Sequence, residues 1–194
     1  MEHIVLIHGF AATGNPQSHK AQVLRAVFPG ITLHAPTIAY HEPGWFGRIE
    51  ALVQTLDKPL LVGNSLGGFA ALALSRNLGL PAILVNPALE PWMLLAGLQG
   101  VQTNFDTGNP FEWAPRATEY LQEIWNQAPT GGPNTPWQAA LLGTQDTLLD
   151  VARSKVLLEA MQIRWFEFPD DHRFNARFEE GMRMLVKELE GGTP

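Results

Sequence analysis

Short apolar runs alternate along the chain with longer segments in which apolar residues recur at helical spacing. The apolar runs occupy residues 4–7, 31–34, 60–62, 82–85, 139–142 and 165–168. Several of them are continuously apolar, which is typical of parallel strands covered on both faces. Helical patterns lie between them at residues 18–28, 45–56, 66–78, 151–161 and 175–190. This order predicts a doubly wound α/β fold with a mostly parallel sheet of about six strands.

The segment at residues 88–137 breaks the alternation between the fourth and fifth predicted strands. It is rich in proline and carries four of the six tryptophans, namely Trp92, Trp113, Trp125 and Trp137. One interpretation is an ordinary crossover helix with a long surface loop. The other is a lid-like insertion that packs over the carboxyl edge of the sheet and lines a pocket. Long irregular segments in small domains are often functional, which favours the insertion.

Composition and charge narrow the class of protein. With 194 residues, 45% of them hydrophobic, the chain suits a single globular domain over residues 1–194. The absence of cysteine excludes disulfides, thiolate metal sites and a cysteine nucleophile. The net charge of −6, without a basic cluster, gives no support for nucleic-acid binding. The first apolar run is typical of a strand and no run is long enough for a bilayer, so a cytoplasmic protein is expected.

The strongest chemical motif is G-x-S-x-G, formed by Gly63, Ser65 and Gly67 between a predicted strand and a predicted helix. This is the context of a nucleophile elbow, in which a strained turn exposes the serine hydroxyl. Strand and helix approach closely at such a turn, so the flanking positions must lack side chains. A capping serine in a glycine-rich turn is the alternative. The preceding strand, the following helix and the additional Gly68 favour Ser65 as a nucleophile.

Attack by a serine creates an oxyanion that needs preorganised hydrogen-bond donors. On this fold one donor is the N–H after the nucleophile, here that of Leu66, and the other comes from the loop after the first strand. That loop begins His8-Gly9-Phe10, which points to the N–H of Phe10. We expect His8 to brace the loop by side-chain hydrogen bonds and to take no part in the chemistry.

A serine nucleophile also needs a general base, and His172 is the only one of the six histidines that follows Ser65. The expected chain order on this fold is serine, acid, histidine. Three carboxylates compete for the acid. Asp146 follows the fifth predicted strand and is favoured, whereas Asp150 precedes a helix and is explained as its N-cap. Glu90, after the fourth strand, is an alternative position.

Taken together, these segments resemble the YqiA-like esterases, small bacterial α/β-hydrolases that lack the usual two N-terminal strands. The matching segments are residues 6–10, 18–21, 63–68, 85–88, 91–95, 108–110, 144–150 and 171–174. The resemblance spans nearly the whole chain. It implies esterase activity, on short acyl esters or acyl-CoA thioesters, with catalytic residues at Ser65, Asp146 and His172. The chain departs from the family pattern at Gln145 and at residues 169–171, which bears on substrate preference.

Five residues are candidates for lining an acyl pocket: Phe10, Asn64, Leu66, Trp92 and Trp113. Packing in the core explains these aromatic side chains equally well, because aromatic residues dominate cores. No histidine pair has zinc-binding spacing and no glycine-rich nucleotide motif occurs, so neither a metal nor a cofactor is expected.

Two further polar residues have structural explanations. Asn86, at the end of the fourth strand, is expected to bond loop backbone. Lys20, at a helix start, could meet an anionic group, but a solvated ammonium is favoured.

The sequence therefore predicts a cofactor-free serine esterase or thioesterase acting on a small-molecule acyl substrate, with no nucleic-acid or membrane partner. Its oligomeric state is left open. Fold alone does not fix function, so a non-hydrolytic binding protein on the same fold is one alternative. An acyltransferase or a carbon–carbon bond hydrolase with the same three residues is another.

Overall fold

The structure is a computed structural model that describes residues 2–128 and 135–190. A six-stranded sheet runs in the order β2-β1-β3-β4-β7-β8, and every neighbouring pair is parallel. Its strands are β1 (His3–Ile7), β2 (Thr32–His34), β3 (Leu60–Asn64), β4 (Ala82–Val85), β7 (Gln138–Gly143) and β8 (Arg164–Phe168). The predicted parallel sheet is confirmed. The chain leaves β1 and β3 in opposite directions, so the crevice between their carboxyl ends is where such folds bind ligands.

The central strands β1, β3, β4 and β7 are buried on both faces, which explains why they are mostly apolar, whereas the edge strands β2 and β8 carry exposed polar residues. Successive residues of β1 alternate between two hydrophobic cores, with Ile4 and Leu6 in one and Val5 and Ile7 in the other. A strand that alternated apolar with polar residues would place polar groups in one of these cores.

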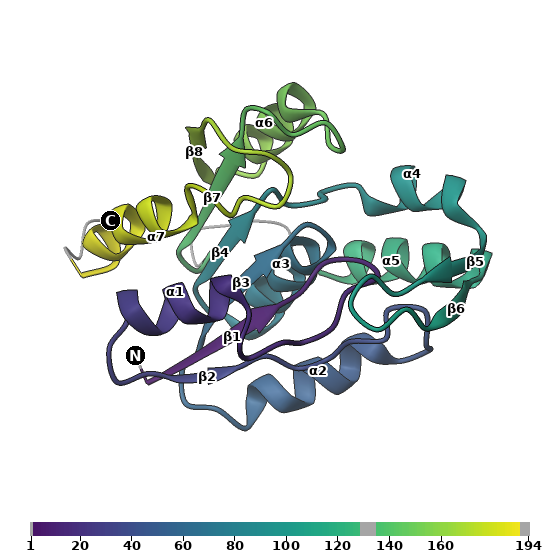
Figure 1. The fold of residues 1–194 in the computed structure, drawn as a ribbon, viewed down its shortest axis with the longest axis horizontal. Helices are drawn as coiled ribbons and strands as arrows, with labels where there is room; N and C mark the ends of the chain where they lie inside the picture. The colour runs from purple at the N-terminus through teal and green to yellow at the C-terminus, as the bar shows by residue number, and fades with distance from the viewer. Residues whose placement is uncertain (1, 129–134, 191–194) are drawn as a thin grey trace.

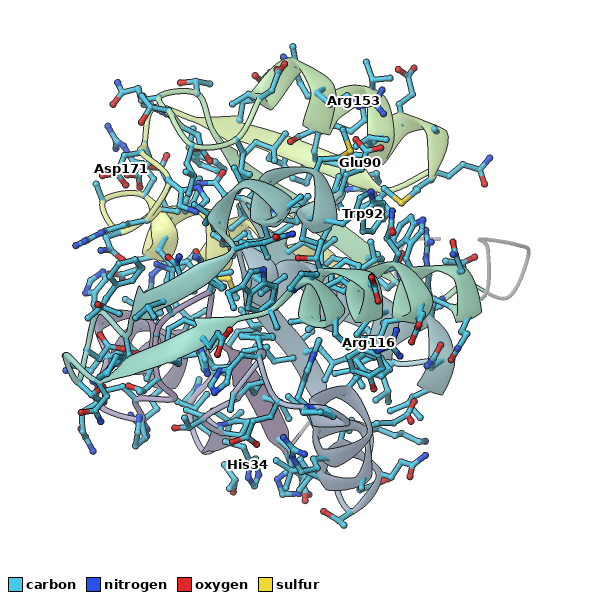
Figure 2. All side chains as sticks on the ribbon, turned by 90° about the vertical axis from the view of Figure 1, so that its right-hand side faces the viewer. His34, Glu90, Trp92, Arg116, Arg153 and Asp171 are labelled. Carbon is cyan, nitrogen blue, oxygen red and sulfur yellow. The ribbon has the colours of Figure 1, made fainter. Side chains whose placement is uncertain are left out.

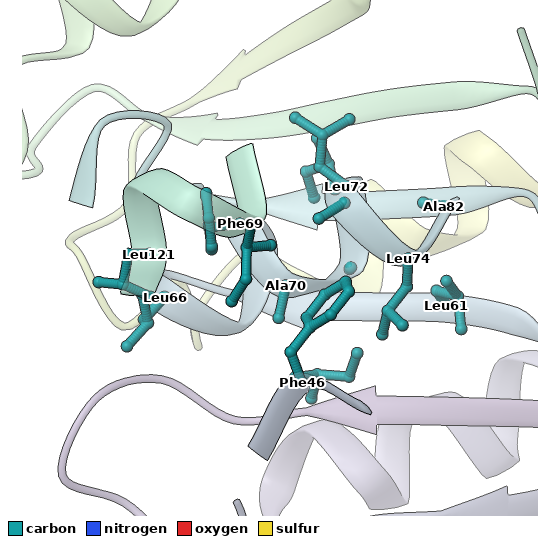
Figure 3. Close-up of a cluster of buried hydrophobic side chains, with 14 of the residues drawn as sticks. Phe46, Leu61, Leu66, Phe69, Ala70, Leu72, Leu74, Ala82 and Leu121 are labelled. Atoms are coloured by element: carbon teal, nitrogen blue, oxygen red, sulfur yellow. The ribbon is translucent and has the colours of Figure 1, made fainter. Parts of the chain in front are cut away.

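Helices α1 (His19–Val27) and α7 (Phe178–Glu190) lie side by side over one face of the sheet (Figure 1). Helices α2 (Trp45–Gln54), α3 (Leu66–Leu78), α5 (Pro115–Gln127) and α6 (Val151–Ala160) contribute to the core on the other face. Figure 3 shows part of this second core, in which Phe46 of α2 and Leu121 of α5 lie near the buried side chains of α3. Helix α3 is buried along almost its whole length, so the helix that follows Ser65 is fixed firmly to the sheet.

The helix starts show how local sequence sets the boundaries. The Ser18 hydroxyl accepts the N–H of Ala21 and caps α1, and the Asp150 carboxylate accepts the N–H of Arg153 and caps α6. The last helix begins at Phe178, three residues later than predicted. The preceding backbone is held in a loop, because the N–H of Arg177 donates to the Asp170 carboxylate.

Residues 88–137 contain a crossover helix and an insertion before it. Helix α4 (Pro91–Leu95), the 3-10 helix η1 (Ala96–Leu98) and an antiparallel pair, β5 (Gly100–Thr103) and β6 (Pro110–Trp113), precede α5. This part lies on the right in Figure 1, towards which β1 points. The N–H of Phe105 donates to Ala11, in the loop after β1, at 2.7 Å. The insertion therefore contacts the carboxyl edge, while residues 129–134 of the predicted segment lie outside the described residues.

Among the helices of the described residues, none combines the length and the apolar character needed to cross a membrane.

Substitution of a fully buried residue in α3 tests the second core. Leu72 is 0% exposed, so Leu72→Ala is expected to lower the free energy of unfolding by about 2 to 5 kcal/mol, through lost burial and a residual cavity. Urea unfolding followed by circular dichroism measures this change. Val156 of α6 is 57% exposed, and Val156→Ala is the control, with an expected change within about 0.5 kcal/mol. Equal effects of the two substitutions would contradict the packing described here.

Candidate active site

Ser65 occupies the tight turn between β3 and α3 in a conformation that is rare for a residue with a side chain. Its backbone angles are φ 57° and ψ −120°. Hydrogen bonds to the end of β4 hold the turn, because the Ser65 N–H donates to Val85 and the Ser65 carbonyl accepts from Ala88. A strained conformation persists only where its surroundings determine it in this way. The elbow predicted from G-x-S-x-G is therefore present in the backbone.

The glycines around Ser65 are required by contact with backbone. A Cβ added at Gly63 would lie 2.1 Å from the carbonyl oxygen of Gly67, and one at Gly67 would lie 2.2 Å from that of Ile7. A Cβ at Gly68 would lie 2.9 Å from Pro87. Strand β3, helix α3 and the end of β1 thus meet more closely than any side chain allows.

The structure brings Ser65, His172 and Asp146 into one chain of hydrogen bonds. The Nε2 atom of His172 lies 3.1 Å from Ser65 Oγ, and its Nδ1 lies 2.7 Å from Asp146 Oδ2. An ionised carboxylate can only accept, so we assign the imidazole proton to Nδ1. The Ser65 hydroxyl then donates to Nε2, which is the arrangement that a general base requires.

Asp146 is held as an ionised acceptor. Its Oδ1 accepts the N–H groups of Leu148 and Leu149 at 2.8 and 2.9 Å, and its side chain is only 1% exposed. Burial tends to raise the pKa of Asp146, but the hydrogen bonds from His172, Leu149 and Leu148 outweigh it and lower that pKa below its ordinary value. Asp146 is thus suited to hold the ring of His172.

The two alternative acids have other partners. Asp150 caps α6, as expected from the sequence. Glu90 pairs with Arg153 of α6, with two hydrogen bonds at 2.9 and 3.0 Å, and Figure 2 shows these two side chains close together. Of the three carboxylates that the sequence left open, Asp146 is the one that contacts His172.

Asn86 joins the loops that carry Asp146 and His172. It is 2% exposed, and its Nδ2 donates to the carbonyls of Asp171 and His172 at 2.9 and 3.1 Å. Its Oδ1 accepts the N–H of Gly143, at the end of β7, at 2.7 Å. The expectation that Asn86 bonds loop backbone is confirmed. One amide thereby fixes both loops relative to β4.

Lys20 supports the loop after His172 from the other side. Its Nζ donates to the carbonyl of Arg173 and, at 2.8 Å, to Oδ1 of Asn175, and it lies 5.3 Å from the ring centroid of Phe178. Burial lowers the pKa of Lys20 to about 8 against the opposing charges of Asp170 and Asp171. The expectation of a solvated Lys20 is wrong, because its ammonium group donates to two protein oxygens. These partners lie more than 150 residues away along the chain, so the local sequence does not reveal them.

The loop after β1 is braced by His8. Its Nδ1–H donates to the carbonyl of Gly9, and its Nε2 accepts the N–H of Ile38, both at 2.8 Å. Burial lowers the pKa of His8, although the bond to Gly9 opposes this, so the neutral ring is favoured. The bracing role predicted for His8 is confirmed.

The two N–H groups nominated as oxyanion donors are free to bind a ligand. Within the described part of the chain, no protein atom accepts a hydrogen bond from the N–H of Phe10 or of Leu66. The N–H of Leu66 also opens α3, where the helix dipole favours negative charge. Gly9 brings the first of these loops close to the serine, since a Cβ there would lie 3.3 Å from Ser65 Cβ.

A cavity of about 480 Å³ opens above Ser65 and His172. Phe10, Asn64 and Leu66 line it, as expected. The rest of its wall is mostly apolar and comes largely from the insertion, with Leu94, Leu95, Leu98 and Phe105, joined by Leu148 from the loop after β7. The sequence analysis missed these residues, although large apolar side chains in a segment without regular periodicity were a signal.

Trp92 and Trp113 do not line this cavity, contrary to expectation. Trp113 is 0% exposed, packs edge-on against Phe10 and donates its Nε1–H to Thr118 at 3.0 Å. Trp92 packs against Phe69 and Trp125. Large aromatic side chains are stabilised most when they are fully buried. These tryptophans therefore pack against other aromatic side chains and do not face the cavity.

Within residues 2–128 and 135–190, no three histidine, aspartate or glutamate side chains lie together in a way that could hold a metal ion.

The chain matches one protein family in sequence and several known proteins in structure. A family model described as an uncharacterised protein family, UPF0227, matches residues 3–187. Est1E from Butyrivibrio proteoclasticus has a similar structure, with a TM-score of 0.72, 17% identity, and coverage of 98% of this chain and 88% of that one. A monoacylglycerol lipase from Paleococcus ferrophilus has a TM-score of 0.70 and 16% identity, over 98% of this chain and 95% of that one. The fold is that of the α/β-hydrolases.

The hydrogen bonds of Asp146 predict a pH dependence of stability. Because the folded state lowers the pKa of Asp146, its ionised form contributes stability above the unfolded pKa of about 3.9, and this contribution is lost as the pH falls through the folded pKa. The free energy of unfolding of the wild type should therefore fall more steeply below about pH 5 than that of Asp146→Asn, which does not titrate. Urea unfolding at several pH values measures both slopes, and parallel slopes would show that Asp146 is not held as a carboxylate.

Proposed function

Since the chain belongs to UPF0227, the family of the YqiA-like esterases, we propose that it is a serine hydrolase that cleaves carboxylic esters or thioesters. The observation that carries this proposal is the chain of hydrogen bonds from Asp146 through His172 to Ser65, at the floor of an apolar cavity. Nucleophile, base and orienting acid in this geometry recur on unrelated folds because acyl transfer requires these three roles.

In the first half of the reaction, Ser65 Oγ bonds to the acyl carbon while Nε2 of His172 takes the hydroxyl proton. The negative charge that forms on the carbonyl oxygen is stabilised by the N–H groups of Phe10 and Leu66, and one such donor is typically worth about 10²- to 10³-fold in rate. Asp146 stabilises the imidazolium. His172 then gives its proton to the leaving oxygen or sulfur, and the bond between that atom and the acyl carbon breaks.

In the second half, water attacks the acyl group on Ser65. His172 takes a proton from this water and returns it to Ser65 Oγ as the acid leaves. Apart from the substrate and water, all the reacting groups belong to the chain itself.

The apolar cavity is suited to the acyl part of a small-molecule substrate. Its wall exposes large apolar side chains whose contact with water is unfavourable, among them Leu98 at 38% and Phe105 at 78% exposure. The similar structures include a thioesterase domain and Est1E with bound ferulic acid, which supports acyl substrates with either oxygen or sulfur leaving groups.

The proposal predicts that Ser65→Ala lowers kcat/KM for p-nitrophenyl butyrate by at least about 10³-fold, because the hydroxyl that forms the acyl-enzyme is removed. Release of p-nitrophenol measures the rate. Ser154→Ala in α6 is the matched control and should retain wild-type activity. It removes a hydroxyl that donates a hydrogen bond to the backbone carbonyl of Asp150.

Activity of a folded Ser65→Ala protein near that of the wild type would refute the mechanism. A ligand bound without turnover by the wild type would favour a binding protein. Ester products formed in the presence of an alcohol would favour acyl transfer.

The cavity also predicts a dependence on acyl length. For the wild type, kcat/KM should rise from p-nitrophenyl acetate to the hexanoate by up to about fourfold per methylene, since burying one contributes about 0.8 kcal/mol. Phe105→Ala should reduce this slope, because Phe105 lines the cavity. Val101, 76% exposed on the same insertion but outside the cavity wall, provides the control Val101→Ala. Equal slopes in the two variants would place the acyl chain elsewhere.

A further inference from the structure

Exposed apolar side chains gather at the cavity that Ser65 and His172 line. Of the seven large apolar side chains that are exposed in the described part of the chain, five lie at the wall of this cavity or directly beside it: Met93, Leu94, Leu98, Phe105 and Leu148. We call these five residues the apolar rim. Single exposed apolar residues are ordinary, but a group of them around a cavity marks a surface that another apolar body covers.

The segment that forms most of this rim has no side suited to water. Residues 91–98 make up α4 and η1, and they contain no charged side chain and, apart from the indole N–H of Trp92, no polar one. Pro91 and Leu95 are buried, whereas Met93 is 74% exposed. A helix that is apolar all round is usually covered on every side. The outer side of α4 and η1 is uncovered.

The position of the rim decides what can cover it. Leu94, Leu98, Phe105 and Leu148 line the same cavity as Ser65, so the rim is continuous with the wall of the candidate active site. A protein partner or a second copy of the chain seated there would obstruct the cavity that an ester must enter. A lipid surface would instead deliver the substrate, because an acyl chain would pass from one apolar environment to another without exposure to water.

The distribution of charge indicates the kind of lipid surface. Segments that bind anionic lipids carry lysine and arginine beside their apolar face, and residues 91–98 have neither. Among the described residues that line the cavity, Arg173 is the one with a permanent charge. The chain as a whole has a net charge of −6, which disfavours approach to an anionic surface. An uncharged or zwitterionic surface fits these features best.

We propose that the apolar rim docks on the uncharged surface of an aggregated lipid, and that the substrates are acyl esters of neutral alcohols that aggregate in water. This inference rests on the proposed function, because the docked surface supplies the ester that Ser65 attacks. Residues 91–98 are far too few to cross a bilayer, so the contact is peripheral.

Vesicle binding tests docking apart from chemistry. In the full chain carrying Ser65→Ala, which prevents turnover, co-sedimentation with dioleoyl phosphatidylcholine vesicles should show binding, and vesicles rich in phosphatidylserine should bind less. Adding Met93→Gln should weaken binding to the neutral vesicles by roughly tenfold, because burial of an exposed methionine is lost. Met93 does not line the cavity, so this substitution leaves the candidate active site intact.

Val101→Thr is the matched control for Met93→Gln. Val101 is 76% exposed and lies beside Gln102 on β5. Gln102 lines the cavity, and successive side chains of a strand point to opposite faces, so Val101 faces away from the rim. Val101→Thr should leave vesicle binding unchanged.

Hydrolysis of tributyrin tests whether docking serves the reaction. For the wild type, the rate should rise a second time when tributyrin exceeds its solubility limit and forms droplets. Met93→Gln should reduce this second rise while leaving the rate with dissolved p-nitrophenyl butyrate unchanged. Val101→Thr should retain both rates.

The docking surface is refuted if the wild type shows no second rise and the Ser65→Ala protein does not bind neutral vesicles. Equal effects of Met93→Gln and Val101→Thr would also overturn it. A dimer in sedimentation velocity that Met93→Gln dissociates would assign the rim to a second copy of the chain. Vesicle binding by a protein whose wild type hydrolyses neither tributyrin nor p-nitrophenyl butyrate would instead refute the proposed function.

Discussion

The close approach of β3, α3 and the end of β1 is the constraint on which the rest of the site depends. Gly63 and Gly67 let backbone contact backbone where any Cβ would lie about 2 Å from a carbonyl oxygen. Ser65 is left with a positive φ, and bonds to Val85 and Ala88 hold it there. Burial of α3 on nearly all sides provides the stability that maintains this strain. The hydroxyl is thereby presented at the carboxyl edge of the sheet, beside the first N–H groups of a helix.

His172 depends on a different kind of support, because it lies in a loop. Side chains from two other elements hold that loop: Asn86 at the end of β4 and Lys20 at the start of α1. Asp146 is fixed in turn by two backbone N–H groups, and Asn86 anchors the preceding Gly143. Preorganisation of this kind matters for acyl transfer, since a small misplacement of a general base costs rate. Ser65 is thus positioned by backbone packing and His172 by buried polar contacts.

The sequence predicted the features that arise locally or from chain order. Short, largely apolar runs predicted the six strands, and the elbow followed from glycines flanking Ser65 between a strand and a helix. The strands β5 and β6 were not predicted, because they are short and largely exposed, so burial leaves little pattern in them. The roles of Lys20 and Trp113 depend on which distant segments meet, which periodicity does not encode. Asp146 was favoured over Asp150 by position after a strand, and the contact with His172 agrees.

The central claim is that Ser65 is a nucleophile activated by His172. A fluorophosphonate ester reacts covalently with such a serine, and peptide-level mass spectrometry locates the adduct. The account predicts a single adduct on the peptide that contains Ser65, formed rapidly by the wild type and at least about 10²-fold more slowly by His172→Ala, since a positioned general base contributes at this level. An adduct on another residue, or no adduct on the folded wild type, would contradict it.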